Sequence, residues 1–395
     1  MFNSRVIVFR RKFQKSLSLS LRVYSKHSTI DIYSRNMASN LPQLKVTEDL
    51  ESSEYDALVV VAPSIKSIPF EKVADPLKAY IEVDKTGETG IFVVPSNLPS
   101  KKIVFSGTGS LENDYDDVSL YTKAAKNGIK KALATGAKAP LLLFNSTRFP
   151  EAGTVALLGA LEALYVPIEV REQVPERAVK AEKLGIFGNA QKIGDKLELA
   201  RALEAGRIVS RDIGGSDPER MAAPKVEEYC RQEFEGSNVK IEVVKGQATF
   251  EQEYPCFAAV NRCASQVERH DGRVIWLTYE PEGPIEKTLM LVGKGINYDT
   301  GGADIKAGGI LISILGIFEL LKIFLFSGKM AGMSRDKNGA ADVAGILKVV
   351  SMLKPNNVKV VGAMAMARNS VGSNAYVADE IITSRAGIRI RVGNT

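Results

Sequence analysis

Short apolar runs alternate along the first half of the chain with segments whose apolar residues recur at helical spacing. Apolar runs bounded by turn residues are typical of buried strands, and a spacing of three or four residues is typical of amphipathic helices. We predict strands at residues 57–62, 91–94, 102–105 and 141–144, and helices at about 118–133, 155–165 and 196–205. Strands that alternate with helices in this way predict an α/β fold.

A polar stretch rich in turn-forming residues, SRDIGGSDPE at positions 210–219, follows the last of these helices. Clusters of such residues are typical of loops and of boundaries between domains. We therefore expect two α/β domains, an N-terminal one at residues 38–205 and a second one at residues 206–395.

The second half of the chain continues the alternation of helix and strand. Pro224 is a residue type favoured in the first turn of a helix, and apolar residues follow it at helical spacing. These residues are Val226, Tyr229, Cys230 and Phe234. Strands are predicted at 239–243, 274–279 and 288–292. The last of them would leave Lys294 just past a strand end, where open α/β sheets bind ligands.

Composition narrows the class of protein. A chain of 395 residues that is 45% hydrophobic and 25% charged has enough apolar material for two globular domains. Its three cysteines lack CxxC spacing, which argues against both a disulfide framework and a cysteine zinc cluster. This cysteine usage favours a reducing compartment, and we expect the protein in the cytoplasm.

The net charge of +6 comes from the N-terminal end. Residues 1–30 hold seven Lys and Arg and no acid, so the rest of the chain sums to about −1 and gives little basis for nucleic-acid binding. A leader at residues 1–37 that is rich in Arg, Ser and Leu is typical of a mitochondrial transit peptide, which would direct the protein to the matrix. The alternative is a wrongly extended start, since Met37 would serve as an initiator.

A glycine-rich stretch carries the candidate chemistry. Lys294, Asp299 and Lys306 lie within thirteen residues, and Asp336 follows in 333-MSRDKNGAADVAGILKVV-350 at the start of a predicted helix. Two carboxylates and a lysine can bind divalent metals, provided that the lysine is deprotonated. The alternative is a solvated surface loop. The sequence contains neither a GxxxxGK[ST] phosphate loop nor an HExxH motif, and His270 is expected in a surface turn.

Several segments resemble the catalytic half of the leucine (cytosol) aminopeptidase family. They are 291-LVGKGINYDTGGADIKAGG-309, 336-DKNGAADVAG-345, 358-VKVVGAMAMARNS-370, 374-NAY-376, 383-TS-384 and 394-NT-395. The chain most resembles the branch that carries YDTGGADIK where other members carry FDSGG. The resemblance is strong over residues 286–395, weaker over 205–285 and faint in the N-terminal domain.

This resemblance implies a catalytic domain with a mixed sheet flanked by helices, and a two-metal aminopeptidase that acts on peptides. Lys294, Asp299 and Asp336 match metal-binding positions for two divalent ions, Zn or Mn, and Lys306 matches the catalytic lysine that stabilises the oxyanion. Met333 matches a position that lines the pocket for the first side chain, which implies a preference for apolar N-terminal residues. The resemblance also implies a hexamer and a bicarbonate bound by the full-length enzyme.

The chain departs from the family at its C-terminal end. The family motif NTDAEGR supplies further metal ligands and an arginine for the bicarbonate, whereas this sequence ends at Thr395. We expect a catalytic domain that is incomplete at its C-terminus, with one flank of its sheet uncovered and without activity in the form given. The alternative is a non-catalytic pseudo-peptidase that works as a binding or scaffold protein.

Residues 310–328 interrupt the motif region. Asp299 and Asp336 lie farther apart than in the family by the length of this segment, 19 residues, and its removal restores the family spacing. We interpret it as the translation of a retained intron. The alternatives are a genuine buried or interface helix and a membrane anchor. For an anchor, the apolar part at 310–326 is short against the roughly 20 residues of a bilayer span and includes Glu319 and Lys322.

Overall fold

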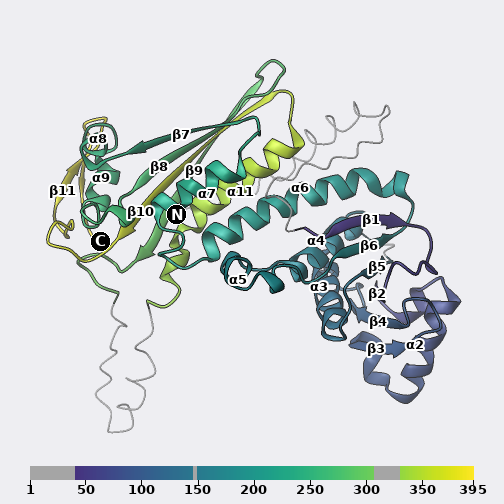
Figure 1. Cartoon of the computed structure of the whole chain (residues 1–395). Helices are drawn as coiled ribbons and strands as arrows, with labels where there is room; N and C mark the ends of the chain where they lie inside the picture. Colours follow the sequence, from purple (N-terminus) through teal and green to yellow (C-terminus); the bar gives the residue numbers. More distant parts are fainter. Residues whose placement is uncertain (1–40, 146–148, 307–329) are drawn as a thin grey trace, which may run out of the picture. The chain divides into compact units, whose positions relative to one another are not determined.

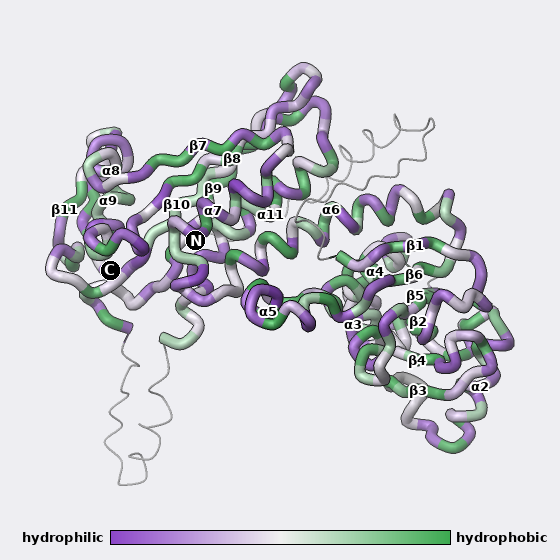
Figure 2. The backbone as a smooth tube through the Cα atoms, in the orientation of Figure 1, coloured by the Kyte–Doolittle hydropathy of each residue, from purple (hydrophilic) through white to green (hydrophobic). Residues whose placement is uncertain are grey.

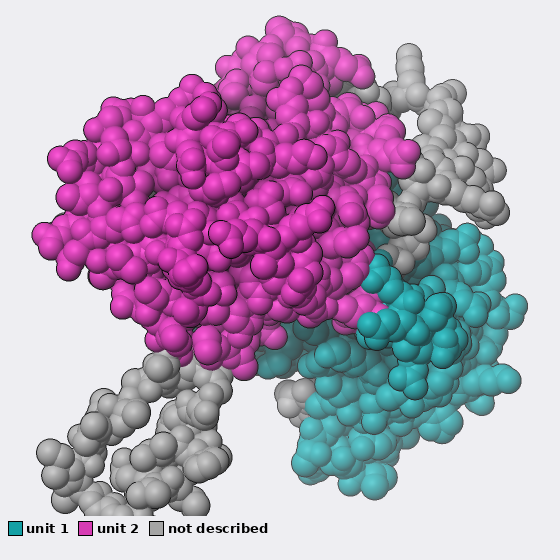
Figure 3. Space-filling model, turned by 60° about the vertical axis from the view of Figure 1, so that its left-hand side comes forward, with its two compact units in different colours: residues 1–166, 170–204 teal, residues 167–169, 205–395 magenta. Residues whose placement is uncertain are grey.

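The computed structural model describes residues 41–145, 149–306 and 330–395 (Figure 1). The chain divides into two compact units, the first made of Met1–Val166 and Val170–Glu204 and the second of Pro167–Glu169 and Ala205–Thr395 (Figure 3). The proposed leader at 1–37 and the segment at 310–328 lie outside the described residues, so the interpretations of both stay predictions.

Unit 1 is built on a six-stranded sheet in the order β1-β6-β5-β2-β4-β3. The strands are β1 (Gln43–Thr47), β2 (Ala57–Ala62), β3 (Ile91–Pro95), β4 (Lys102–Gly107), β5 (Pro140–Phe144) and β6 (Lys183–Phe187). All neighbouring strands run parallel except β3, which pairs with β4 in the antiparallel direction. The predicted strands are confirmed, and β2 is buried along its whole length and green in Figure 2.

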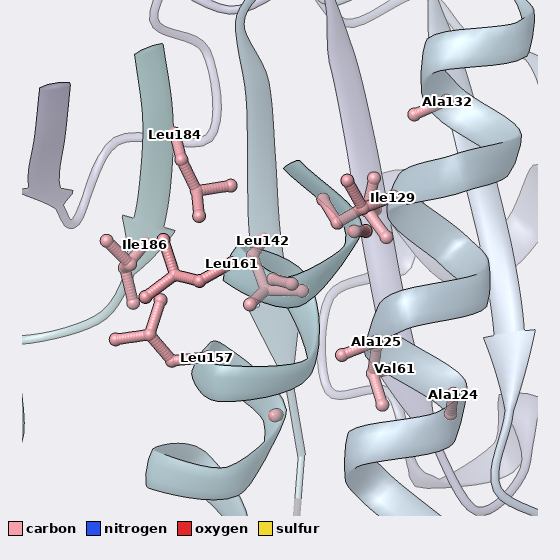
Figure 4. Close-up of a cluster of buried hydrophobic side chains, with 14 of the residues drawn as sticks. Val61, Ala124, Ala125, Ile129, Ala132, Leu142, Leu157, Leu161, Leu184 and Ile186 are labelled. Atoms are coloured by element: carbon pink, nitrogen blue, oxygen red, sulfur yellow. The ribbon is translucent and has the colours of Figure 1, made fainter. Parts of the chain in front are cut away.

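Helices cover this sheet because their apolar faces match the buried strands. The helices of unit 1 are α2 (Glu71–Val83), α3 (Ser119–Ala134), α4 (Ala152–Leu164) and α5 (Ile168–Gln173), with α6 (Ala190–Gly215) continuing into unit 2. Leu157 and Leu161 of α4 lie beside Ile186 of β6 in one core cluster (Figure 4). The residues of this cluster are almost fully buried, so the predicted helices at 118–133 and 155–165 are confirmed by their packing.

Unit 2 has a mixed four-stranded sheet in the order β7-β8-β10-β9 (Figure 1). The strands are β7 (Val239–Lys245), β8 (Arg273–Tyr279), β9 (Lys287–Asp299) and β10 (Val358–Asn369). β10 pairs with β8 in the antiparallel direction and with β9 in the parallel direction. A two-stranded hairpin of β11 (Ile381–Thr383) and β12 (Arg389–Arg391) follows. The predicted α/β fold is therefore confirmed, with a mixed sheet in the second unit.

Helices lie on both faces of this sheet. They are α7 (Ala223–Glu233), α8 (Gln247–Glu253), α9 (Pro255–Asn261) and α11 (Asn338–Leu353). Val226 of α7 and Leu347 of α11 pack with Leu277 of β8, whereas α8 and α9 pack on Val274, which faces the other way. In the described part of the chain β9 is an edge strand, and its residue Val292 is 71% exposed.

The prediction of a loop at 210–219 is wrong over its first half. Helix α6 continues through this stretch to Gly215, because Val209 and Ile213 are buried in the core of unit 2. Gly206 of α6 also meets Gly345 of α11 so closely that an added Cβ would lie 2.4 Å from the Gly345 carbonyl oxygen. Tertiary packing of apolar residues overrides the local turn preference here.

Candidate functional site

Four charged side chains of unit 2 gather at one end of β9. Lys306 Nζ donates to Asp299 Oδ2 at 2.8 Å and lies 3.6 Å from Asp336 Oδ2. Lys294 Nζ lies 3.4 Å from Asp336 Oδ2 and 3.6 Å from Asp299 Oδ2. The two carboxylates are thus bridged by two ammonium groups. The four residues that sequence reasoning singled out are brought together.

Lys294 was predicted to lie just past a strand end, but it lies inside β9. The strand continues to Asp299 because β10 pairs with it residue by residue, with Ala365 opposite Lys294 and Asn369 opposite Asp299. Gly293 and Gly295, which suggested a loop, instead allow close packing, because an added Cβ on Gly293 would lie 2.4 Å from the Gly339 carbonyl oxygen of α11. The candidate site therefore begins on a rigid strand.

A tight turn after β9 returns the chain toward the same carboxylate. Gly301 and Gly302 have φ of +87° and +63°, a region that favours glycine. The Gly301 N–H donates to Asp299 Oδ1 at 3.0 Å, and the Lys306 N–H donates to the Thr300 carbonyl at 2.8 Å. This turn directs the Lys306 side chain back onto Asp299.

A short 3-10 helix, η7 (Met333–Lys337), carries the other carboxylate immediately before α11. The buried Lys337 donates to the carbonyls of Ser216 and Ser334 at 2.8 and 2.6 Å, which ties η7 to the end of α6. Burial lowers the pKa of Lys337 to about 8. Met333 Sδ lies 3.3 Å from Lys306 Nζ, so Met333 also belongs to the site.

Opposite charges stabilise the ionised forms in this group. Burial opposes the ionisation of Asp299, but hydrogen bonds from Lys306 and the Gly301 N–H outweigh it, so the pKa of this carboxyl lies well below its ordinary value. Burial also opposes the charged form of Lys306 and by itself would lower the pKa of this amine. The hydrogen bond to Asp299 and the charge of Asp336 raise the pKa by more, so the pKa of Lys306 lies above its ordinary value. Lys306 is therefore a cation at neutral pH.

The donor set fits a divalent cation in part. Carboxylate oxygens of Asp299 and Asp336 face the same space, and a lysine amine can join them when it is deprotonated. Within residues 41–145, 149–306 and 330–395, no three His, Cys, Asp or Glu side chains are grouped so that they could hold a metal ion. The described residues thus supply two carboxylates and one amine toward a metal site.

Asn369 and Thr395 stand in the quoted motifs but were assigned no role there. Asn369 Nδ2 donates to Asp299 Oδ1 at 2.8 Å and to the Thr395 carbonyl at 3.0 Å. Thr395 in turn donates through its hydroxyl to the Gly301 carbonyl and accepts from the Asp304 N–H at 2.9 Å. The available signal was a polar residue that ends the apolar strand β10.

His270 was expected on the surface, but its side chain is only 11% exposed. Its Nε2 lies 2.8 Å from Glu219 Oε1, which also accepts from Arg368 Nη1 at 3.0 Å, while Arg269 bonds the other oxygen of Glu219. Burial raises the pKa of Glu219, but the bonds to His270 and Arg269 outweigh it and lower the pKa to about 2. Glu219 thus accepts a hydrogen bond from Arg368, which is the residue before Asn369.

The Glu219 cluster should make stability depend on pH. Because the folded-state pKa of about 2 lies below the reference value of 4.5, the contribution of Glu219 is present above pH 4.5 and is lost as the pH falls toward 2. We expect Glu219→Gln to unfold at a lower temperature than the wild type at pH 5, and the difference to shrink toward pH 2.5. Thermal unfolding of both proteins measures it. A constant difference over this range would contradict the assigned ion pairs.

A known family model matches the segments of the chain that carry this site. Residues 208–313 and 322–395 match the model of the catalytic domain of the cytosol aminopeptidase family. The chain is 44% identical over 303 residues to W07G4.4 of Caenorhabditis elegans, which is named as an aminopeptidase, and the match covers 76% of this chain and 54% of that protein. A protein of Synechococcus sp. (strain CC9311) named as a cytosol aminopeptidase is 26% identical over 301 residues, covering 76% of this chain and 56% of the relative. The chain spans about half the length of these curated relatives.

The fold also resembles that of a solved enzyme. The bottromycin maturation enzyme BotP, solved in complex with Mn, superimposes with a TM-score of 0.63 at 18% identity, covering 86% of this chain and 65% of that chain. At this identity the likeness concerns the fold alone.

The mixed sheet and its cluster of lysines and carboxylates lie in the part of unit 2 that matches this catalytic-domain model. The chain resembles the cytosol aminopeptidase family, and the match to the model of its catalytic domain covers residues 208–313 and 322–395. The resemblance inferred from the sequence motifs is thus confirmed.

The family match is interrupted at residues 314–321, which fall inside the segment 310–328. This segment lies outside the described residues, so its three interpretations stay predictions. In the rest of the chain, where the structure describes it, no helix has the length and apolar character needed to cross a bilayer.

Proposed function

We propose that the protein to which this chain belongs is a metal-dependent aminopeptidase that releases N-terminal residues from peptides. The convergence of Lys294, Asp299, Lys306 and Asp336 within 3.6 Å carries the proposal, because these residues come from three separate segments and lie in the family's catalytic domain. The names of the relatives support the same activity.

Asp299, Asp336 and Lys294 would hold divalent cations in this protein. When bound, such cations polarise a carbonyl group and lower the pKa of a bound water. The two carboxylates supply the anionic oxygens, and Lys294 would supply a neutral amine after losing its proton. The Mn complex of BotP supports a divalent ion, and Zn or Mn both suit these donors.

Lys306 would stabilise the negative charge that develops on the substrate oxygen. Its ammonium group is charged and held 2.8 Å from Asp299, so a hydrogen-bond donor stands ready at the carboxylate cluster. When cations neutralise the carboxylates, this donor can turn to the substrate oxygen. Met333, 3.3 Å from the same ammonium group, would line the pocket for an apolar first side chain.

The described residues also favour a second candidate, a non-catalytic binding or scaffold protein. Two carboxylates return only part of the charge of two divalent ions, and the structure brings no third His, Cys, Asp or Glu to them within the part of the chain it describes. A longer form that continues with DAEGR after Thr395 would supply the remaining ligands under the aminopeptidase proposal. A hexamer, a bicarbonate and a cytoplasmic location belong to the same proposal for the full-length protein.

Metal binding tests the proposal directly. We expect the chain as given to bind Mn²⁺ with fewer than two ions per chain or more weakly than micromolar, and Asp336→Asn to weaken binding by at least about tenfold, because a carboxylate ligand is lost. Isothermal titration calorimetry measures both. Glu242→Gln, which removes an exposed carboxylate of β7 paired with Lys240, is the control. Equal binding by wild type and Asp336→Asn would place the metal elsewhere.

A further inference from the structure

Asn369 is a buried amide at the end of an apolar strand. It closes β10, is 4% exposed, and sits opposite Asp299 of β9 after an irregularity in the strand register at Ala367. Its backbone carbonyl accepts from the N–H and the hydroxyl of Thr300, at 3.0 and 3.1 Å. The residue therefore contacts the start of the turn that carries Lys306.

The orientation of the amide is determined by its neighbours. Nδ2 lies 2.8 Å from Asp299 Oδ1 and 3.0 Å from the Thr395 carbonyl, which are both acceptors. The opposite orientation would bring the amide oxygen against two oxygens, so it is excluded. Both N–H groups of the amide are thus used, one on each partner.

The amide oxygen has no hydrogen-bond donor among the described residues. It faces Gly302, where an added Cβ would lie 3.0 Å from it and 2.9 Å from the Thr395 hydroxyl. A buried oxygen without a donor costs stability. The two N–H groups, which both donate to acceptors, account for an amide at this position.

The two oxygens of the Asp299 carboxylate have different partners. Oδ1 accepts from Asn369 and from the Gly301 N–H, while Oδ2 is left facing Lys306 at 2.8 Å and Lys294 at 3.6 Å. Rotation of the carboxylate would break both bonds to Oδ1. The hydrogen bonds therefore fix the carboxylate so that one oxygen faces Asn369 and the turn and the other faces the cluster.

We infer that Asn369 is a positioning residue: it orients Asp299 so that Oδ2 alone faces the candidate metal centre, and it anchors Thr395 to the same carboxylate. This inference rests on the proposed function, since the oriented oxygen is the one that would bind the cation. Hydrogen-bond partners of metal ligands typically change metal affinity by about 10–100-fold when removed.

The chain offers a matched control in Asn297. This residue lies on the neighbouring strand β9, is 1% exposed, and also has an amide oxygen without a donor among the described residues. Its Nδ2 donates to the Pro218 carbonyl at 3.1 Å rather than to a residue of the charged cluster. Replacing either asparagine by Ala therefore removes a buried amide, but only the replacement of Asn369 removes a donor to Asp299.

The test compares Mn²⁺ binding of wild type, Asn369→Ala and Asn297→Ala by electron paramagnetic resonance of free Mn²⁺, with the unfolding temperature of each. We expect Asn369→Ala to bind about 10–100-fold more weakly, and Asn297→Ala to bind as the wild type does even if it unfolds earlier. Equal Mn²⁺ affinity of Asn369→Ala and wild type would overturn the inference. Asn369→Ser serves if the Ala variant does not fold.

A metal-free crystal structure of the Asn369 variant separates this inference from the proposed function. If the wild type binds no Mn²⁺, the metal proposal fails, and the position of Asp299 decides the positioning role. A carboxylate rotated so that Oδ1 also turns toward Lys306, with Thr395 displaced, supports the role. A carboxylate in its present orientation overturns it.

Discussion

Replacing Lys306 with Met in a longer, active form that continues past Thr395 is expected to lower turnover by on the order of 10²-fold or more, as the loss of an oxyanion donor does. Met keeps an unbranched side chain of nearly the same length and removes its charge. The reason lies in the site: Lys306 is held at 2.8 Å from Asp299 and its pKa is raised, so its ammonium group is available as a charged donor.

The measurement is kcat on an apolar aminoacyl substrate, together with the metal content of each protein. Lys240→Met is the matched control, because Lys240 is an exposed lysine of β7 whose ion pair with Glu242 does not involve the charged cluster. If Lys306→Met keeps the wild-type rate with the metal bound, the role assigned to Lys306 is wrong. If its rate falls because the metal is lost, Lys306 acts on the metal site instead.

Replacing Gly293 with Ala is expected to destabilise unit 2 by about 1–3 kcal/mol, the usual cost of inserting atoms into a packed interior. The added Cβ would lie 2.4 Å from the Gly339 carbonyl oxygen and within 2.6 Å of the backbone of Ala340. Because backbone atoms cannot rotate out of the way, α11 would have to move away from β9, and Asp336 would move away from Lys294.

Differential scanning calorimetry of the chain measures this effect. Gly215→Ala is the control, since that glycine is an exposed helical residue of the same unit and an added Cβ there meets no atom within 4 Å. An unchanged unfolding temperature for Gly293→Ala would contradict the close approach of β9 and α11.

The strands and helices that local patterns predicted are present, whereas two stretches that were interpreted as loops are not loops. The apolar run 57–62 and the Pro224 helix appear as β2 and α7, because burial and local preference agree there. The glycines around Lys294 and the turn formers at 210–215 were interpreted as loops, yet both lie inside elements. Gly293 of β9 and Gly214 of α6 each allow a close approach to α11, which no local pattern reveals.

The sequence by itself determined the α/β class, the family and the identity of the charged residues that gather at β9, because motif residues and hydrophobic periodicity are local properties. Only the tertiary structure decided that Lys294 lies within a strand, that Lys306 and Asp336 lie close together, and that Asn369 donates to both Asp299 and Thr395. The physical reason is that pairing of β9 with β10 and packing of α11 act between residues that are far apart in the sequence. In the sequence, such contacts are indicated only by an isolated glycine or asparagine.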